Sequence, residues 1–84
     1  MDLSRAIITE HAAMQMSKRQ IAGDEVLAVL ARPEQVLPVR PGRVVAQTVA
    51  GRHLMRAFVD VDREPPEVVT VYRTSRIEKY RRQP

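Results

Sequence analysis

Four strand-like segments follow one another between residues 34 and 72, and the connections between them are short. In chain order, these segments are EQVLPV, VVAQTVA, HLMRAFVDV and EVVTVY. A Pro-Gly turn at RPGR, a turn at Gly51 and the loop DREPPE separate them. Because a parallel pair needs a crossover of about a dozen or more residues, these connections predict a four-stranded antiparallel sheet. Pro38 places the first strand at an edge of the sheet, since proline cannot donate to a ladder.

The residues before these strands predict two helices. Thr9 suits the N-cap of a helix over about residues 10–18. At 100° per residue, one side of this helix is apolar and is expected to face the core, with Ala12, Ala13 and Met16. The other side is expected to face solvent or a cleft, with His11, Gln15 and Lys18.

The segment AGDEVLAVLARP predicts the second helix, which Pro33 ends. Its buried side is expected to consist of Val26, Leu27 and Leu30. Near the C-terminus, Ser75 to Glu78 has the S-x-x-E pattern of a capping box, which predicts a short helix. The elements together predict an α+β fold in one domain, residues 1–84, with two N-terminal helices packed on a four-stranded antiparallel sheet and a short C-terminal helix.

The net charge of +4 comes from the end of the chain. The first 72 residues carry 9 basic and 9 acidic side chains, whereas from Arg73 onward 5 basic residues accompany Glu78 alone. A basic terminus favours a polyanion or an acidic protein as partner. The alternative interpretation is a solvated terminus without a partner.

The composition and the N-terminus also indicate the cellular compartment of the protein. The chain has no cysteine, which fits a reducing cytoplasm. The N-terminus MDLSRAIITEH lacks a basic leader followed by an apolar run, so no signal peptide is expected. No apolar segment is long enough to cross a bilayer. We therefore expect a cytoplasmic protein without a membrane partner.

Three stretches resemble a family of small bacterial proteins catalogued as a domain of unknown function. They are EHAAMQMSKRQI, EVLAVLARPEQV and VVTVYRTSRIEKY. The family reads H-A-x-x-R-M-x-x-R-G-I, then has a helix that ends in N-P, and closes on V-T-V-Y-x-T-S-K-x-x-K-Y. It is thought to share the fold of RelE/ParE-like and BrnT-like toxins, many of which are metal-independent ribonucleases. The resemblance implies a RelE-like toxin of a toxin–antitoxin system, which cuts RNA without a cofactor and is inhibited by an acidic antitoxin.

The resemblance can be carried over by position. The first motif is matched by His11, Met16 and Arg19, and the last by Thr70, Tyr72, Thr74, Ser75, Lys79 and Tyr80. Two positions depart from the pattern. Gln15 replaces an arginine of the family and so removes a cation from the implied site. Arg76 replaces a lysine; it keeps the charge, but a guanidinium does not exchange protons near neutral pH.

Metal-independent cleavage of RNA needs a base for the 2′-hydroxyl, a cation for the developing charge and an acid for the leaving oxygen. His11 is the candidate acid or base, because an unperturbed imidazole titrates near neutral pH. The expected catalytic residues are His11, Arg19, Arg56, Thr74, Lys79 and Tyr80. The expected RNA-binding and phosphate-binding residues are Lys18, Arg73, Arg76 and Arg81. No metal ligands and no cofactor are expected.

Each candidate also has a structural interpretation. His11 can be an exposed helix residue, and the arginines can be scattered surface charge. Arg56 is of special interest, because strand alternation places it opposite Met55 and Ala57, on the face away from the helices. His53 follows the turn at Gly51 and is interpreted as surface.

Three functions remain open on the sequence. The first is the toxin-like ribonuclease. The second is a non-catalytic module of the same fold that binds RNA or a protein, as ParE-like relatives do. The third is an assembly partner whose basic end docks on an acidic surface.

Overall fold

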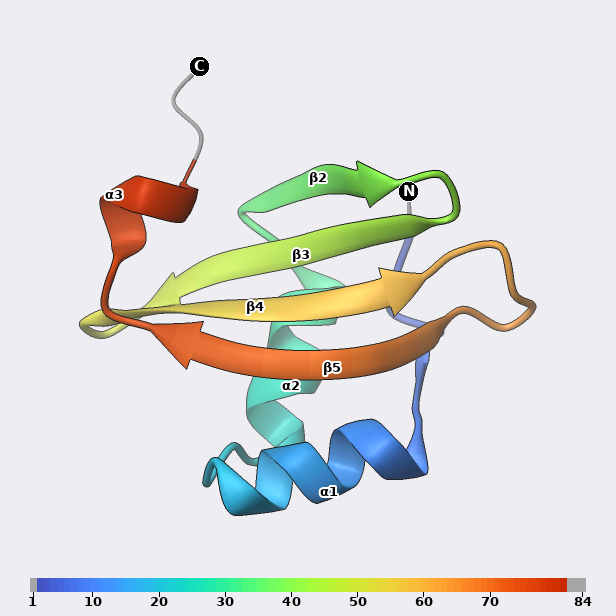
Figure 1. Cartoon of the computed structure of the whole chain (residues 1–84), viewed down its shortest axis with the longest axis horizontal. Helices are drawn as coiled ribbons and strands as arrows, with labels where there is room; N and C mark the ends of the chain where they lie inside the picture. The colour runs from blue at the N-terminus through green and yellow to red at the C-terminus, as the bar shows by residue number, and fades with distance from the viewer. Residues whose placement is uncertain (1, 82–84) are drawn as a thin grey trace.

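The structure is a computed structural model that describes residues 2–81. Figure 1 shows the order of its elements along the chain. They are β1 (Ile7–Ile8), α1 (Glu10–Lys18), α2 (Gly23–Ala31), β2 (Gln35–Arg40), β3 (Arg43–Ala50), β4 (His53–Asp60), β5 (Glu67–Thr74) and α3 (Ile77–Tyr80). The predicted α+β class is confirmed, and so is the short helix near the C-terminus.

The sheet differs from the one predicted. Among the described residues it has five strands, in the order β1-β5-β4-β3-β2, and is mixed rather than purely antiparallel. The additional strand, β1, pairs in parallel with the start of β5, where Ile7 faces Glu67 and Ile8 faces Val68. Two residues are too few to show the alternation that identifies a strand in a sequence, which is why β1 was missed. The expectation of two N-terminal helices on a four-stranded antiparallel sheet was therefore wrong.

The other four strands are antiparallel neighbours, and β2 lies at the outer edge as Pro38 predicted. The turn between β2 and β3 contains Gly42 at φ +84°. A Cβ atom at this position would lie 2.7 Å from a carboxylate oxygen of Asp62, so both the backbone angle and the close approach favour glycine.

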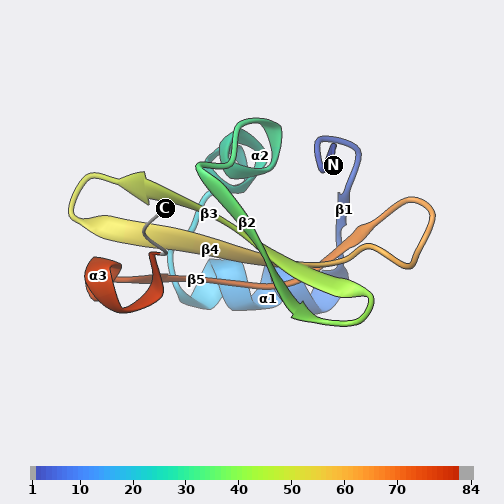
Figure 2. The ribbon, with the colours of Figure 1, turned by 90° about the horizontal axis from the view of Figure 1, so that it is seen from above.

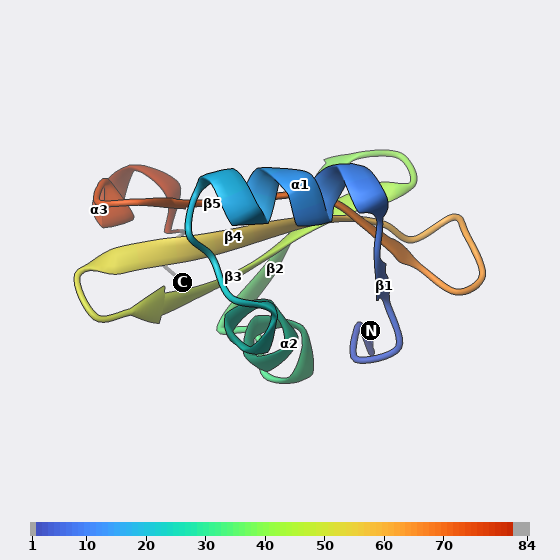
Figure 3. The ribbon, with the colours of Figure 1, turned by 90° about the horizontal axis from the view of Figure 1, so that it is seen from below.

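Helices α1 and α2 share one hydrophobic core with one face of the sheet. Helix α1 runs alongside β5, and α2 lies behind β3 and β4 in Figure 1; Figure 3 shows both from below. The face of β4 in this core carries Met55, Ala57 and Val59, as the alternation predicted. Helix α3 lies on the other side of the sheet from α2 (Figure 2).

Two helix faces were predicted incorrectly in part. In α2, Leu27 is exposed, and Val29 takes its expected place in the core beside Val26 and Leu30. In α1, Ala12 and Met16 are buried as expected, but Ala13 is exposed. Both residues lie at the border of the apolar stripe, where a rotation of the helix by a few tens of degrees decides burial.

Both ends of α1 have well-defined caps. Thr9 is the N-cap as predicted, because its Oγ1 accepts a hydrogen bond from the backbone N–H of Ala12 at 3.1 Å. At the other end, Gln20 has φ +56°. The N–H of Gln20 donates to Ser17, and the N–H of Ile21 donates to Met16. These are the two bonds of a Schellman motif.

Helix α3 begins differently from the prediction. Its N-cap is Arg76 and not Ser75, and no side chain accepts a hydrogen bond from its first turn. Instead, Thr74 Oγ1 accepts from the backbone N–H of Arg76 at 3.1 Å. The predicted capping box is therefore absent here, and a threonine at the strand end orders the turn before the helix.

In the part of the chain that the structure describes, no helix has the length and apolar character needed to cross a membrane.

Candidate functional site

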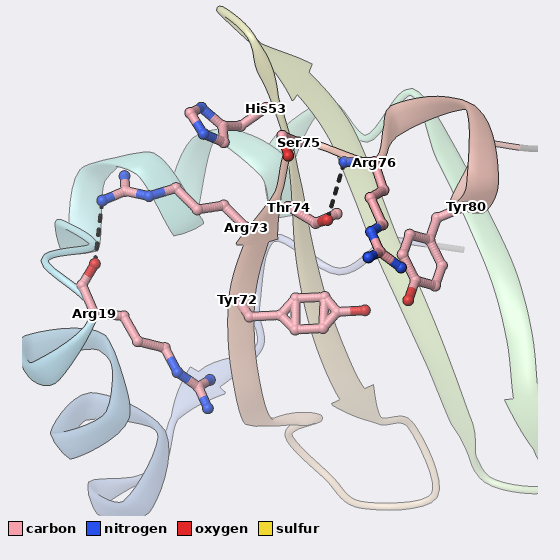
Figure 4. Close-up of a pocket in the computed structure, with 8 residues that line it drawn as sticks. All are labelled: Arg19, His53, Tyr72, Arg73, Thr74, Ser75, Arg76 and Tyr80. Atoms are coloured by element: carbon pink, nitrogen blue, oxygen red, sulfur yellow. Dashed lines mark hydrogen bonds between the residues drawn. The ribbon is translucent and has the colours of Figure 1, made fainter.

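A pocket of about 790 Å³ lies where β5 ends and the chain turns into α3. Figure 4 shows its lining. The lining residues are Arg19, His53, Tyr72, Arg73, Thr74, Ser75, Arg76 and Tyr80. Three of these eight side chains are arginines, and none is a carboxylate. We call this hollow the strand-end pocket. Its lining attracts anions, because no acid within it neutralises the guanidinium groups.

The C-terminal end of α1 supplies one side of the strand-end pocket. The Arg19 side chain reaches the outer edge of β5 and donates from Nη1 to the carbonyl of Val71 at 2.7 Å. Arg73 donates from Nη2 to the carbonyls of Arg19 and Gln20, each at 3.1 Å (Figure 4 shows the first). These carbonyls are at the negative end of α1, where a cation is stabilising. Arg73 also lies 3.9 Å from Glu25, a long and half-exposed ion pair.

Arg76 differs from these two arginines. Its side chain makes no hydrogen bond or ion pair with any residue from 2 to 81. In Figure 4 it extends alongside Tyr80. The turn that carries it is fixed by Thr74, so the backbone is held while the guanidinium keeps all five N–H donors for a ligand.

Arg56 lies on the open face of the sheet, and the protein's own side chains surround it. Its Nε donates to Gln47 Oε1 at 2.8 Å, and its Nη1 donates to Tyr72 Oη at 2.7 Å. Its Cζ atom lies 4.4 Å from the ring centroid of Tyr80, 5.3 Å from that of Phe58 and 5.7 Å from that of Tyr72. These distances are within the range of cation–π attraction.

Gln47 connects this arginine to α3. The side chain is 1% exposed, and its Nε2 donates to Gln35 Oε1 at 2.8 Å and to the backbone carbonyl of Tyr80 at 3.0 Å. A buried amide with all these bonds is satisfied. Arg56 and Gln47 thus fasten α3 to the sheet, and through it they position Tyr80 at the strand-end pocket.

A second, smaller pocket of about 290 Å³ lies on the same face of the sheet. Its lining residues are Leu37, Pro38, Val39, Val45, Arg56, Phe58, Lys79 and Tyr80. We call it the sheet pocket. Five of its eight lining residues are apolar, and its two charged residues are both cations. Tyr80 lines both pockets.

The structure divides the predicted catalytic residues between these two places. Arg19, Thr74 and Tyr80 line the strand-end pocket, and Arg56, Lys79 and Tyr80 line the sheet pocket. His11 lines neither. It lies two helical turns before Arg19, which at 1.5 Å per residue is about 12 Å along α1. Its Nε2 atom is 3.1 Å from Nε2 of Gln15.

The predicted phosphate-binding residues are divided as well. Arg73 and Arg76 line the strand-end pocket. Lys18 is an exposed residue of the last turn of α1 and lines neither pocket. Arg81 lies outside both pockets and forms an ion pair of 2.6 Å with Glu34.

His53 and Ser75 line the strand-end pocket, although the sequence reasoning assigned no site role to either. His53 is the first residue of β4, and β4 pairs with β5 up to Leu54 and Thr74. Antiparallel pairing therefore brings the start of β4 to the end of β5. The predicted hairpin order already contained this information, because a strand that begins at residue 53 must begin where its neighbour ends.

The ionisable groups whose pKa values are shifted lie away from both pockets. The Arg43 guanidinium donates two hydrogen bonds to Asp60, at 2.6 and 3.2 Å, and lowers the pKa of that carboxyl below its ordinary value of 3.8. Asp60 is therefore committed to a structural ion pair. Its acidic neighbours form no group of three or more potential metal ligands within residues 2–81.

Comparison with known proteins places the chain in a family. No curated protein and no solved structure matches it. Residues 8–73, however, match the family described as Domain of unknown function (DUF4258). This range runs from β1 into β5 and includes Arg19, His53, Tyr72 and Arg73 of the strand-end pocket. Since the match covers most of the 84 residues, the chain belongs to the DUF4258 family.

Proposed function

We propose that the protein binds single-stranded RNA and holds RNA phosphates in the strand-end pocket. The observation that carries this proposal is the lining of the pocket, in which three arginines and two tyrosines occur without a carboxylate. Guanidinium forks match the geometry of phosphate oxygens. Tyrosine rings offer a surface on which an unpaired base can stack, and such a base is available only in a single strand.

The three arginines suit different parts of this task. Arg19 and Arg73 each donate hydrogen bonds to backbone carbonyls, so their side chains are held in position before a ligand binds. Each retains further N–H groups, because arginine has five donors. Arg76 has no such commitment among the described residues and can move onto a phosphate. Two anchored cations and one mobile cation favour binding of a flexible polyanion.

As a second candidate function we propose metal-independent endoribonuclease activity in the same pocket. The observation that favours it is the presence of His53 beside the arginines. An imidazole can remove the proton of the 2′-hydroxyl, whose oxygen then attacks phosphorus while the bond from phosphorus to the 5′-oxygen breaks and that oxygen takes a proton from water. The arginines would stabilise the charge on the phosphorane. In this proposal His53 and not His11 is the acid or base, because His11 lies outside the lining.

The resemblance to RelE/ParE-like and BrnT-like toxins favours a biological role for this binding in a toxin–antitoxin system. A toxin that binds RNA in this pocket would be inhibited by an acidic antitoxin covering the same arginines. The RelE/ParE-like or BrnT-like relationship and the antitoxin remain proposals.

RNA binding can be tested by fluorescence anisotropy with a labelled single-stranded RNA of twelve nucleotides in EDTA. We expect the affinity to fall as salt rises, since bound phosphates release counterions. Arg76→Gln is expected to weaken binding about tenfold, the value of one charge-assisted contact, and to leave the melting temperature unchanged. Arg40→Gln is the matched control. Arg40 is also exposed, but it is the last residue of β2, and β2 ends at the opposite end of the sheet from α3 (Figure 1).

Two results would contradict the binding proposal. One is wild-type protein without RNA affinity at low salt, and the other is equal affinity of Arg76→Gln and Arg40→Gln.

Cleavage is tested separately by gel analysis of the same RNA in EDTA. We expect His53→Gln to remove cleavage and His11→Gln to retain it. Intact RNA after prolonged incubation would leave binding as the function.

A further inference from the structure

The sheet pocket has a composition unlike that of the strand-end pocket. Strand β2 supplies Leu37, Pro38 and Val39, while Val45 and Phe58 come from β3 and β4. These five residues have apolar side chains. The lining residues with polar side chains are Arg56, Lys79 and Tyr80. A hollow of about 290 Å³ that is lined by aliphatic and aromatic residues, with cationic side chains beside them, suits a flat ring of small size that also offers polar edges.

Tyr80 connects this pocket to the arginines. It lines both pockets, so the two hollows adjoin at this residue. A ligand that fits both must have an anionic part and a flat, mostly apolar part joined by a short linker. A nucleotide has this form, because its ribose joins the phosphate to the base.

We propose that the sheet pocket binds the base of the nucleotide whose phosphate lies in the strand-end pocket. This inference rests on the proposed function, since it takes the phosphate site as given. The base enters between the β2 wall and Tyr80, with its ring against Phe58 and its sugar passing the Tyr80 hydroxyl.

The polar groups of the sheet pocket restrict which base edge faces them. Lys79 and Arg56 can only donate hydrogen bonds. Two donor groups of Arg56 are already used on Gln47 and Tyr72, which leaves three N–H groups for a ligand. The matching edge must therefore accept, as the carbonyl oxygens of uracil and guanine do. Uracil is the smaller of these two bases and fits the pocket volume more easily.

The experiment compares two ligands that share a phosphate and differ in the base. Ribose 5-phosphate tests the strand-end pocket alone, whereas uridine 5′-monophosphate tests both pockets. Binding is followed by two-dimensional amide NMR, which also reports where each ligand lies. With wild-type protein we expect uridine monophosphate to bind about tenfold more tightly. We also expect it alone to shift the amides of Val39 and Phe58.

The variant Val39→Trp blocks the sheet pocket, because Val39 is 45% exposed and an indole there can fill the opening without entering the core. We expect it to remove the preference for uridine monophosphate and to leave ribose 5-phosphate binding unchanged. The matched control is Leu27→Trp, which places the same ring at a residue of α2 that is 49% exposed and should keep the preference. Lys79→Ala is the second variant. It removes a donor without adding bulk and should reduce the preference.

Three outcomes would overturn the inference. If both ligands bind wild-type protein equally, the base has no site. If Val39→Trp keeps the wild-type preference, the base lies elsewhere. If wild-type protein binds neither ligand, the phosphate site fails as well, and this result is distinguishable from the first two because ribose 5-phosphate binding is measured on its own.

Discussion

Replacement of Arg56 tests the conclusion that this residue fastens α3 to the sheet. Arg56→Ala removes the hydrogen bonds to Gln47 and Tyr72 and leaves the Gln47 amide oxygen without that donor in a side chain that is 1% exposed. A buried polar group without its partner costs about 1–3 kcal/mol. Loss of the cation–π contact with Tyr80, the closest ring, adds about 0.5–1 kcal/mol. We expect the free energy of unfolding to fall by about 1.5–4 kcal/mol.

Urea unfolding followed by circular dichroism measures this loss directly. In thermal unfolding, a loss of about 1 kcal/mol lowers the melting temperature of a domain of this size by about 4–8 °C, so the melting temperature should fall by at least about 6 °C. Arg40→Ala is the control: it removes an exposed arginine at the other end of the sheet and should change the free energy by less than about 0.5 kcal/mol. Arg56→Lys should also be destabilised, because one ammonium cannot replace a planar fork that donates in two directions while stacked on a ring. An Arg56→Ala protein as stable as Arg40→Ala would refute the network described here.

Two further predictions concern stability. Gln20→Gly should stabilise the protein by about 0.5–1 kcal/mol in urea unfolding, because Gln20 has φ +56° and glycine adopts this conformation without steric cost; an unchanged midpoint would contradict the strain inferred at this cap. For Asp60, the hydrogen bonds from Arg43 lower its pKa in the folded protein, so the pair stabilises the fold fully above the ordinary carboxyl value of 3.8, and this contribution is lost as the pH falls below 3.8 toward the lowered pKa. Asp60→Asn should therefore be less stable than wild-type protein at neutral pH but should lose less stability below pH 4, when unfolding is measured from pH 7 to pH 3. An identical pH profile in wild-type protein and Asp60→Asn would contradict the lowered pKa of Asp60.

The four longer strands could be predicted because their signals are local. Prolines and glycines mark the turns, and the alternation in β4 correctly placed Met55 and Arg56 on opposite faces. The caps at Thr9 and the end of α2 before Pro33 also depend on neighbouring residues only. Strand β1 could not be predicted in this way. Its two isoleucines become a strand because β5 lies beside them, and that proximity is a property of the tertiary structure.

The candidate site was predicted in part for the same reason. Arg73 and Arg76, two residues of the basic end that were expected to bind phosphate, both line the strand-end pocket at the exit of β5. The sequence did not indicate that Arg56 is enclosed by the three aromatic rings of the protein, since its neighbours come from separate strands and from α3. The sequence also gave no reason to assign His11 and Arg19 to different sites, because residues about two turns apart on a helix point in similar directions.

The strand that the sequence did not reveal explains why the pocket lies where it does. Strand β1 pairs with only Glu67 and Val68, so the remaining outer edge of β5 is left for another element. Helix α1 takes this place: Thr9 bonds to Val68 at its start, and Arg19 donates to the carbonyl of Val71 at its end. A β1 that continued in the same register as far as Val71, three pairs beyond Val68, would occupy that part of the edge and would displace Arg19 from it. The short first strand is therefore the condition that allows a guanidinium from α1 to meet those from the end of β5 in one pocket.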